Sequence, residues 1–257
     1  MERQLKRKIH YFIKSPYRGR ADVRSTLRDL SAQGRLAIVG GMLRDVALFG
    51  NAGFRSDLDL VIDPYDLAAF DRRMANVGAR VNRFGGYSLP SHKWQVDVWP
   101  LERTWAHREG YVRVRTIWDL RDATFFRCDA IVYDFASDRI GTAPGYFDEL
   151  KNKLLDINLR PNPNPKGNAV RAFRYALLKG FQWKLGVAQF VAETIDEIGW
   201  KALVDDELRS FRSQHIERIR IDEFERALRE YLASSSDEPF APGQFQRIVQ
   251  LELPHVK

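Results

Sequence analysis

The stretch LAIVGGMLRDVALFG (residues 36–50), followed by SDLDLVID (56–63), decides how this chain is expected to fold. LAIV is a short apolar run that closes on two glycines, which predicts a buried strand. The residues after the glycines have helical spacing as far as Gly50, a glycine that ends the pattern. SDLDLVID alternates polar and apolar residues, as a half-buried strand does. The predicted order is therefore strand, glycine turn, helix, strand.

Asp57 and Asp59 lie two residues apart on the second predicted strand. Because side chains alternate along a strand, both carboxylates lie on one face, while Leu58 and Leu60 point into the core. Neighbouring carboxylates repel each other unless a cation neutralises them. Hard oxygen ligands suit Mg²⁺, which usually adds substrate phosphates to one or two carboxylates. The pair therefore predicts a magnesium site.

Asp97 is the third candidate ligand, in the apolar stretch QVDVWPL (95–101) that also reads as a strand. It would complete a three-carboxylate cluster for two Mg²⁺ ions. One ion would activate an attacking hydroxyl and the other would hold a triphosphate.

The glycine turn is the predicted phosphate contact. Gly40 and Gly41 allow a phosphate to approach the backbone, and the start of the following helix favours an anion. Arg44, in the first turn of that helix, can add a charge-assisted bond to phosphate. Asp45 is expected to anchor the loop. A glycine pair or an Asp-x-Asp sequence alone is usually structural, but the two in this order are far more specific.

Composition limits the alternatives. The chain has 257 residues, of which 44% are hydrophobic and 29% charged, as expected of a folded globular protein. Cys128 is its single cysteine, so a disulfide framework or a cysteine zinc site within one chain is excluded. No apolar run approaches about 18 residues and the first residues lack a signal-peptide core, so we expect a cytoplasmic protein without membrane association.

Positive charge is concentrated at the start of the sequence. The net charge is +7, and residues 1–35 contain ten Lys or Arg against three Asp or Glu, so this segment holds all of the excess. Such a segment fits contact with a polyanion, and it equally fits a solvated helix face.

The order of patterns predicts three parts. Residues 1–34 form a basic helical extension, with helices at 3–14 and 21–33. Residues 35–157 form a sheet-containing domain, in which the stretch from Ile117 through CDAIVYDF (128–135) is expected to pack beneath the sheet. Three prolines in LRPNPNPKGN (159–168) break the chain, and residues 158–257 read as helical.

The glycine turn and the Asp-x-Asp strand resemble the GG-x-x-RD…D-x-D signature of the class II tRNA-nucleotidyltransferase (CCA-adding enzyme) and bacterial poly(A) polymerase family. DAIVYDFASDRIGTAPGYFDELKNKLLDI (129–157), GNAVRAFRYALLKGF (167–181), HIERIRIDEFERAL (215–228) and IVQLELP (248–254) extend the resemblance to about residues 35–254. It implies an α+β fold: a polymerase-β-like nucleotidyltransferase head with a mixed sheet, followed by an all-helical neck. It also implies triphosphate binding by Gly40, Gly41 and Arg44, and metal binding by Asp57 and Asp59, with Asp97 as the third acidic residue.

Two motifs depart from the family. Its nucleotide-selecting motif is Glu-Asp-x-x-Arg, whereas this chain reads Gly167-Asn168-Ala169-Val170-Arg171. The resemblance makes Asn168 and Arg171 the base contacts, and base preference can differ because asparagine donates as well as accepts hydrogen bonds. The ribose-contacting motif is eroded, with Asp129 in the place of its asparagine as the remaining candidate sugar contact.

The resemblance implies Mg²⁺-dependent transfer of a nucleotide from a nucleoside triphosphate to an RNA 3′ end, tRNA being the expected acceptor. A toxin or defence role that blocks tRNA charging is one setting for this activity. Transfer to a small molecule or a protein, and a degenerate RNA-binding protein without turnover, are the alternatives. The basic extension, with Lys6, Arg7, Lys8 and Arg18, is expected to replace part of the RNA grip.

Overall fold

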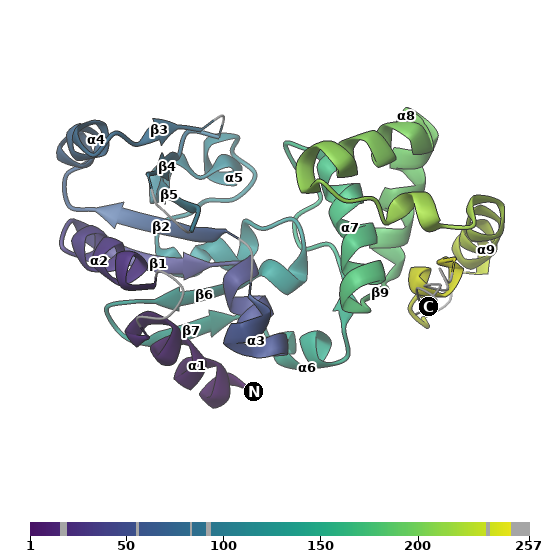
Figure 1. Cartoon of the computed structure of the whole chain (residues 1–257), viewed down its shortest axis with the longest axis horizontal. Coiled ribbons are helices and arrows are strands. Elements are labelled where there is room, and N and C mark those ends of the chain that lie inside the picture. Colours follow the sequence, from purple (N-terminus) through teal and green to yellow (C-terminus); the bar gives the residue numbers. More distant parts are fainter. Residues whose placement is uncertain (16–19, 55–56, 83, 91–93, 235–236, 248–257) are drawn as a thin grey trace, which may run out of the picture. The chain divides into compact units, whose positions relative to one another are not determined.

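The computed structural model describes residues 1–257 except 16–19, 55–56, 83, 91–93, 235–236 and 248–257 (Figure 1). The chain divides into two compact units. The first contains Met1–Asn152 and Ile157–Pro163, and the second contains Lys153–Asp156 and Asn164–Lys257. The basic extension (1–34) thus lies within the first unit. Arg18 and the stretch 248–254 lie outside the described residues.

A seven-stranded mixed sheet forms the centre of the first unit, in the order β3-β4-β5-β2-β1-β6-β7. Its strands are β1 (Gly34–Val39), β2 (Leu58–Pro64), β3 (Arg80–Val81), β4 (Tyr87–Leu89), β5 (Val96–Pro100), β6 (Ile131–Asp134) and β7 (Arg139–Thr142). The pair β2–β5 is parallel and the other neighbours are antiparallel.

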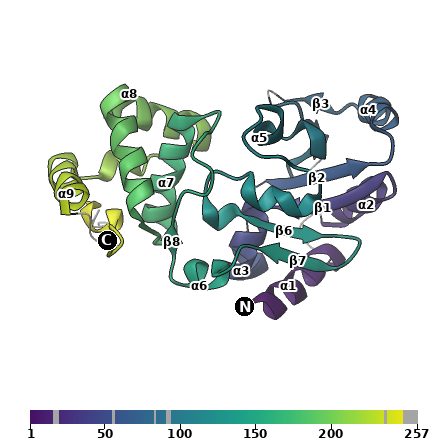
Figure 2. The same ribbon diagram turned by 180° about the vertical axis from the view of Figure 1, so that it is seen from behind.

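Helices lie on both faces of this sheet (Figures 1 and 2). One face carries α1 (Glu2–Lys14), α2 (Arg20–Ser31) and α3 (Gly41–Gly53), and the other carries the 3-10 helix η3 (Ile117–Asp122). The remaining helical elements of this unit are α4 (Leu67–Asn76), η2 (Leu101–Arg103), α5 (Trp105–Arg108), η4 (Arg127–Asp129) and α6 (Tyr146–Lys151). Helix α3 has a non-helical residue at Gly50 (φ 71°), the glycine at which the sequence pattern ended.

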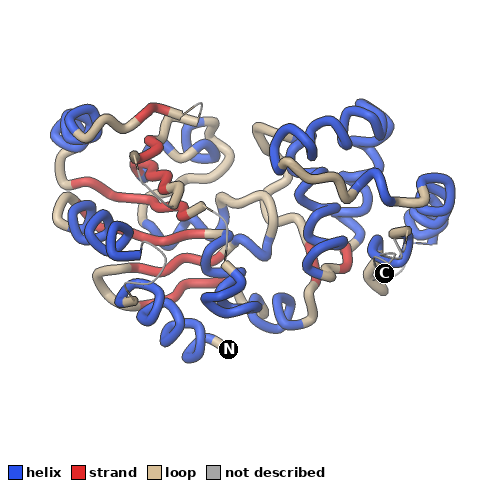
Figure 3. Tube along the Cα trace, in the orientation of Figure 1, coloured by secondary structure: helices blue, strands red, loops and turns tan. Residues whose placement is uncertain are grey.

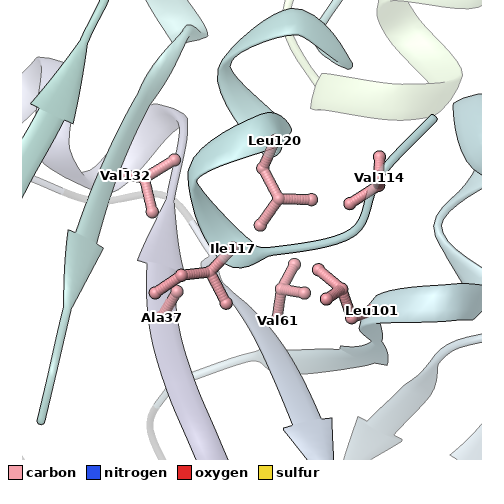
Figure 4. Packing of buried hydrophobic residues seen from close by; sticks show 7 residues of the cluster. All are labelled: Ala37, Val61, Leu101, Val114, Ile117, Leu120 and Val132. Carbon is pink, nitrogen blue, oxygen red and sulfur yellow. The ribbon is translucent and has the colours of Figure 1, made fainter. Parts of the chain in front are cut away.

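Under η3, an apolar cluster fills the space against the sheet (Figure 4). Strands β1, β2 and β6 supply three of its side chains, and η2, η3 and the chain before η3 supply the others. Its buried members are Ala37, Val61, Leu101, Val114, Ile117, Leu120 and Val132. The expectation for residues 117–135 is therefore half right. Residues 117–122 do pack on the sheet, but Ile131–Asp134 is itself a strand, because its backbone pairs with both β1 and β7.

The second unit is mainly helical (Figure 3), and buried aromatic side chains form its core. Phe173, Trp183 and Phe224 are fully buried, and their ring centroids lie 5.0–6.0 Å apart. The elements are β8 (Leu154–Leu155), α7 (Pro165–Lys179), β9 (Gln182–Trp183), α8 (Leu185–Phe211), η5 (Ile216–Arg218), α9 (Ile221–Ser234) and η6 (Pro242–Phe245). The short parallel pair β8–β9 is an addition to the helical pattern that the sequence predicts.

The two units together confirm the predicted fold class, a mixed-sheet head followed by a helical neck. Among the described helices, none combines the length and apolar character needed to cross a bilayer.

Helix α1 is anchored at both of its sides. Leu5, Ile9 and Phe12 are buried beneath it. At its edge, Asp138 in the turn between β6 and β7 accepts hydrogen bonds from Lys6 Nζ (2.9 Å) and His10 Nε2 (2.7 Å). Tyr133 Oη donates to the same carboxylate. Burial opposes ionisation of Asp138, but these bonds outweigh it and lower its pKa to about 2.

We predict that Asp138→Asn lowers the free energy of unfolding at neutral pH by about 1 kcal/mol, because solvent screens these partly exposed pairs. The folded pKa lies below the unfolded one, so the stabilisation is complete above about pH 4 and is lost as the pH falls towards about 2. Urea unfolding of both proteins across this range measures it. The gap between them should close on acidification, and a gap independent of pH would contradict the assignment.

Candidate active site

Asp59 and Asp97 lie opposite each other on adjacent strands. In the parallel pair β2–β5, Asp59 is in register with Asp97 and Val61 with Trp99. Strands in a sheet are about 4.8 Å apart, so the two side chains stand next to each other on one face. Alternation puts them on the face of Val61, which packs in the apolar cluster under η3. The two carboxylates therefore stand beside a rigid apolar layer.

Two side chains orient Asp97. Ser88 on β4 is in register with it and donates its hydroxyl to Oδ1. Gln95 Nε2 donates to Oδ2 at 3.1 Å. Ser88 could not be predicted from the sequence, because it lies on another strand than Asp97. Gln95 lies two residues before Asp97, so the spacing along the strand could have indicated it.

Asp57 precedes β2 and is exposed. Its pKa is raised by partial burial of the carboxyl group and by the negative charge of Asp97. Asp57 therefore experiences the negative charge of Asp97, which lies on β5.

The donor set fits a hard cation in part. Carboxylate oxygens are the ligands that Mg²⁺ takes, and a close acidic pair gains from neutralisation. Within the described part of the chain, however, no three His, Cys, Asp or Glu side chains are grouped closely enough to hold a metal ion. A cation here would thus take protein ligands from a pair of carboxylates and its other ligands from substrate and water.

The glycine turn lies at the same end of the sheet. Strand β1 pairs with β2 as far as Ile38 opposite Leu60, so the turn that follows β1 lies where β2 begins. Gly40 has φ 67° and ψ −127°, a conformation that a side chain would strain, and its N–H donates to Ile131 O at 3.1 Å. Helix α3 starts at Gly41, and its first-turn N–H groups have no acceptors within the helix.

Arg44 and Asp129 meet in the interior, not at this surface. They are 3% and 6% exposed, and Arg44 Nη1 donates to Asp129 Oδ1. Arg44 Nε also donates to Asp45 Oδ1 at 2.8 Å, so Asp45 anchors the turn through Arg44. In this structure the two side chains form a buried ion pair that ties the first turn of α3 to η4. The triphosphate contact of Arg44 and the sugar contact of Asp129 stay predictions.

In the second unit, Asn168 and Arg171 lie together on α7. Arg171 Nη1 donates to Asn168 Oδ1 (3.2 Å), and Arg171 Nη2 donates to Tyr175 Oη (2.8 Å). The guanidinium also lies over the Tyr175 ring, 5.6 Å from its centroid. The spacing 168, 171, 175 places all three on one helix face. Tyr175 is thus a member of this group that spacing alone could have indicated.

Gly167 stands where the resembling motif has Glu, and the local packing explains the glycine. The helix N-cap, Asn164, accepts from Gly167 N at 3.2 Å. A Cβ on Gly167 would lie 2.1 Å from Asn164 Nδ2, so a side chain at this position would displace the capping side chain of Asn164. Asn164 and Gly167 therefore form a matched pair at the start of α7.

We predict that Asp129→Ala is strongly destabilising, by roughly 3 kcal/mol, because it leaves Arg44 buried with one carboxylate fewer. Urea unfolding measures the effect. Asp122→Ala, an exposed aspartate nearby in sequence, is the control and should unfold like the parent protein. If Asp129→Ala had parental stability and only nucleotide binding suffered, Asp129 would be a substrate contact after all.

Comparison with known proteins places the fold. No protein family model and no curated protein matches the sequence. Among solved structures, a tRNA nucleotidyltransferase complexed with a primer tRNA and an incoming ATP analog aligns with TM-score 0.53 and 20% identity, over 81% of this chain and 61% of its own. The Thermotoga maritima CCA-adding enzyme complexed with tRNA aligns with TM-score 0.58 and 14% identity, over 90% of this chain and 55% of its own.

A CCA-adding enzyme in complex with CTP aligns with TM-score 0.52 and 17% identity, over 76% of this chain and 46% of its own. The present chain thus spans about half the length of the structures it resembles. At these identities the likeness concerns the fold. The chain has the fold of the head and neck portion of class II CCA-adding enzymes.

Proposed function

We propose that this chain is a Mg²⁺-dependent nucleotidyltransferase that transfers a nucleoside monophosphate from a nucleoside triphosphate to the 3′ hydroxyl of an RNA, with tRNA as the acceptor. The observation that carries the proposal is the register of Asp59 with Asp97 at the end of the sheet where the Gly40–Gly41 turn starts α3. The fold shared with tRNA nucleotidyltransferases supports it.

Asp59 and Asp97 are the proposed shared protein ligands of two Mg²⁺ ions, and Asp57 is proposed to join them only once the cations and the triphosphate are bound. When bound, Mg²⁺ would neutralise the developing negative charge and lower the pKa of the attacking hydroxyl. The protein's own part is alignment: β2 and β5 fix Asp59 and Asp97, and Ser88 and Gln95 fix the orientation of the Asp97 carboxylate.

The turn at Gly40 and Gly41 is the proposed triphosphate contact, through backbone N–H groups at the start of α3. Arg44 and Asp129 then act behind the turn. Their buried pair holds α3 against η4, so that the N–H groups are already oriented when an anion arrives. This revises the direct contacts that the family resemblance implies for both residues.

Asn168 and Arg171 are the proposed base contacts. Arg171 is a donor only, so the amide oxygen of Asn168 must face it, and the amide nitrogen is then the polar group that Asn168 can offer to a base. A base with a carbonyl oxygen at that position would be favoured over one with an amino group.

The acceptor separates this proposal from its alternatives. Incubation with Mg²⁺, each labelled nucleoside triphosphate in turn and total tRNA should transfer label to RNA. Label on a small molecule or a protein would show that the acceptor is not RNA. No label on any of them would favour an RNA-binding protein without turnover. Loss of aminoacylation of the labelled tRNA would support the toxin or defence role.

We predict that Asp59→Asn reduces nucleotide incorporation by roughly a thousandfold, as the loss of several kcal/mol of charge stabilisation implies. The same change removes a like charge beside Asp97, so thermal stability without metal should not fall. Mg²⁺ together with a non-hydrolysable triphosphate should raise the melting temperature of the parent protein and not that of the variant.

Asp63→Asn is the matched control, since Asp63 lies on the same strand and face as Asp59 but is exposed at the far end. Its incorporation rate and its response to Mg²⁺ should remain parental. Equal activity of Asp59→Asn and the parent protein would refute the metal-dependent reading.

We further predict that Asn168→Asp shifts the nucleotide preference towards bases with an amino group at the recognised edge, cytosine and adenine, because the outward donor becomes an acceptor. Steady-state incorporation of the four nucleotides one at a time measures the ratio, which we expect to change by about tenfold or more. Asn152→Asp, on an exposed residue, is the control. An unchanged ratio would remove Asn168 from base selection.

A further inference from the structure

The cations of α1 fall into two groups with different partners. Lys6 pairs with Asp138, and Lys8 Nζ donates to Val46 O (3.2 Å) and Ala47 O (3.3 Å) near the break of α3. Asn51 Nδ2 donates back to Lys8 O at 3.0 Å. Lys6 thus ties α1 to the β6–β7 turn and Lys8 ties it to α3, so both lysines have an anchoring role within the fold.

Arg3, Arg7 and Lys14 form the second group and are exposed. Within the described part of the chain, none of these three pairs with a carboxylate. At 100° per residue they lie on the side of α1 opposite Leu5, Ile9 and Phe12, and they span about 16 Å of helix length. This outer face of α1 therefore presents three exposed cations that form no ion pair with the described residues.

An exposed aromatic ring stands within the row. Tyr11 is 60% exposed, and it lines a shallow hollow of about 560 Å³ together with Gln4, Arg7, Lys8 and Asn51. Burying a tyrosine is favourable, so a ring exposed to this extent has surface to offer a flat partner. Cations along a track with an aromatic platform between them are what unpaired nucleic acid requires.

We propose that the outer face of α1 (Arg3, Gln4, Arg7, Tyr11 and Lys14) is an RNA-binding surface. Arg3, Arg7 and Lys14 contact successive phosphates, and an unstacked base lies on the Tyr11 ring above the hollow. The inference rests on the proposed function in taking RNA as the partner. It adds a binding surface on the helix layer, the sheet face opposite the one that carries Asp59 and Asp97.

The same geometry argues against an anionic membrane as the occupant. An interfacial helix buries its apolar side in lipid. In α1 that side is occupied by the protein itself, since Leu5, Ile9 and Phe12 are at most 1% exposed. The outward side of α1 presents positive charges and the Tyr11 ring, which favours the phosphate backbone and bases of RNA over a lipid surface.

The test is binding of a fluorescein-labelled tRNA transcript to the full chain by anisotropy, in EDTA so that no turnover occurs. Arg3→Gln, Arg7→Gln and Lys14→Gln combined should weaken binding by about tenfold or more at low salt. The slope of log affinity against log salt should become shallower by about two to three, since each phosphate contact contributes about 0.7–0.9. Arg72→Gln, Arg73→Gln and Arg226→Gln, all exposed, remove the same charge elsewhere.

Equal losses in the two triple variants, or parental affinity in the α1 variant, would overturn the proposal. Tyr11→Ala should weaken binding of an unpaired oligoribonucleotide roughly five- to hundredfold, while Tyr11→Phe keeps it, because stacking needs the ring and not the hydroxyl. Equal affinity of these two variants would remove the stacking role. Since no nucleotide is transferred in this assay, its outcome is independent of whether the incorporation assay succeeds.

Discussion

The repulsion between two carboxylates held side by side is the constraint on which the site depends. Asp59 and Asp97 face each other because β2 and β5 run parallel in register, and the apolar cluster under η3 keeps those strands from separating. Hydrogen bonds from Ser88 and Gln95 fix the orientation of the Asp97 carboxylate. A protein that fixes like charges in this way gains from any cation that joins them, and a triphosphate brings further oxygen ligands to that cation.

The opposite layer gives the glycine turn its shape. Gly40 bends the chain between β1 and α3, and the buried Arg44–Asp129 pair fixes the start of α3. Buried ion pairs contribute little net stability but define one arrangement of the groups around them. Here that arrangement aims the first N–H groups of α3 towards the end of the sheet where β2 begins. Helix α1 is attached to α3 by hydrogen bonds from Lys8, so α3 contacts both the N-terminal helix and the glycine turn.

In the second unit, the residues of α7 that differ from the family motif contact residues close to them in the sequence. Asn164 caps α7 and occupies the space that a side chain at position 167 would need. This accounts for the glycine where the family's nucleotide-selecting motif has glutamate. Three residues on, Asn168, Arg171 and Tyr175 make a continuous set of hydrogen bonds along one helix face. The residues that depart from the family pattern are therefore mutually consistent within this unit.

The sequence alone determined the order of strand, glycine turn, helix and strand and the break at Gly50, because periodicity and glycine geometry act over a few residues. Only the tertiary structure decided which strands become neighbours. The register of Asp59 with Asp97, the pairing of Ile131–Asp134 with β1, and the partner of Arg44 at Asp129 join residues 38 to 97 positions apart. Such pairings depend on how the whole sheet packs against the elements on its two faces, so a local sequence pattern cannot predict them.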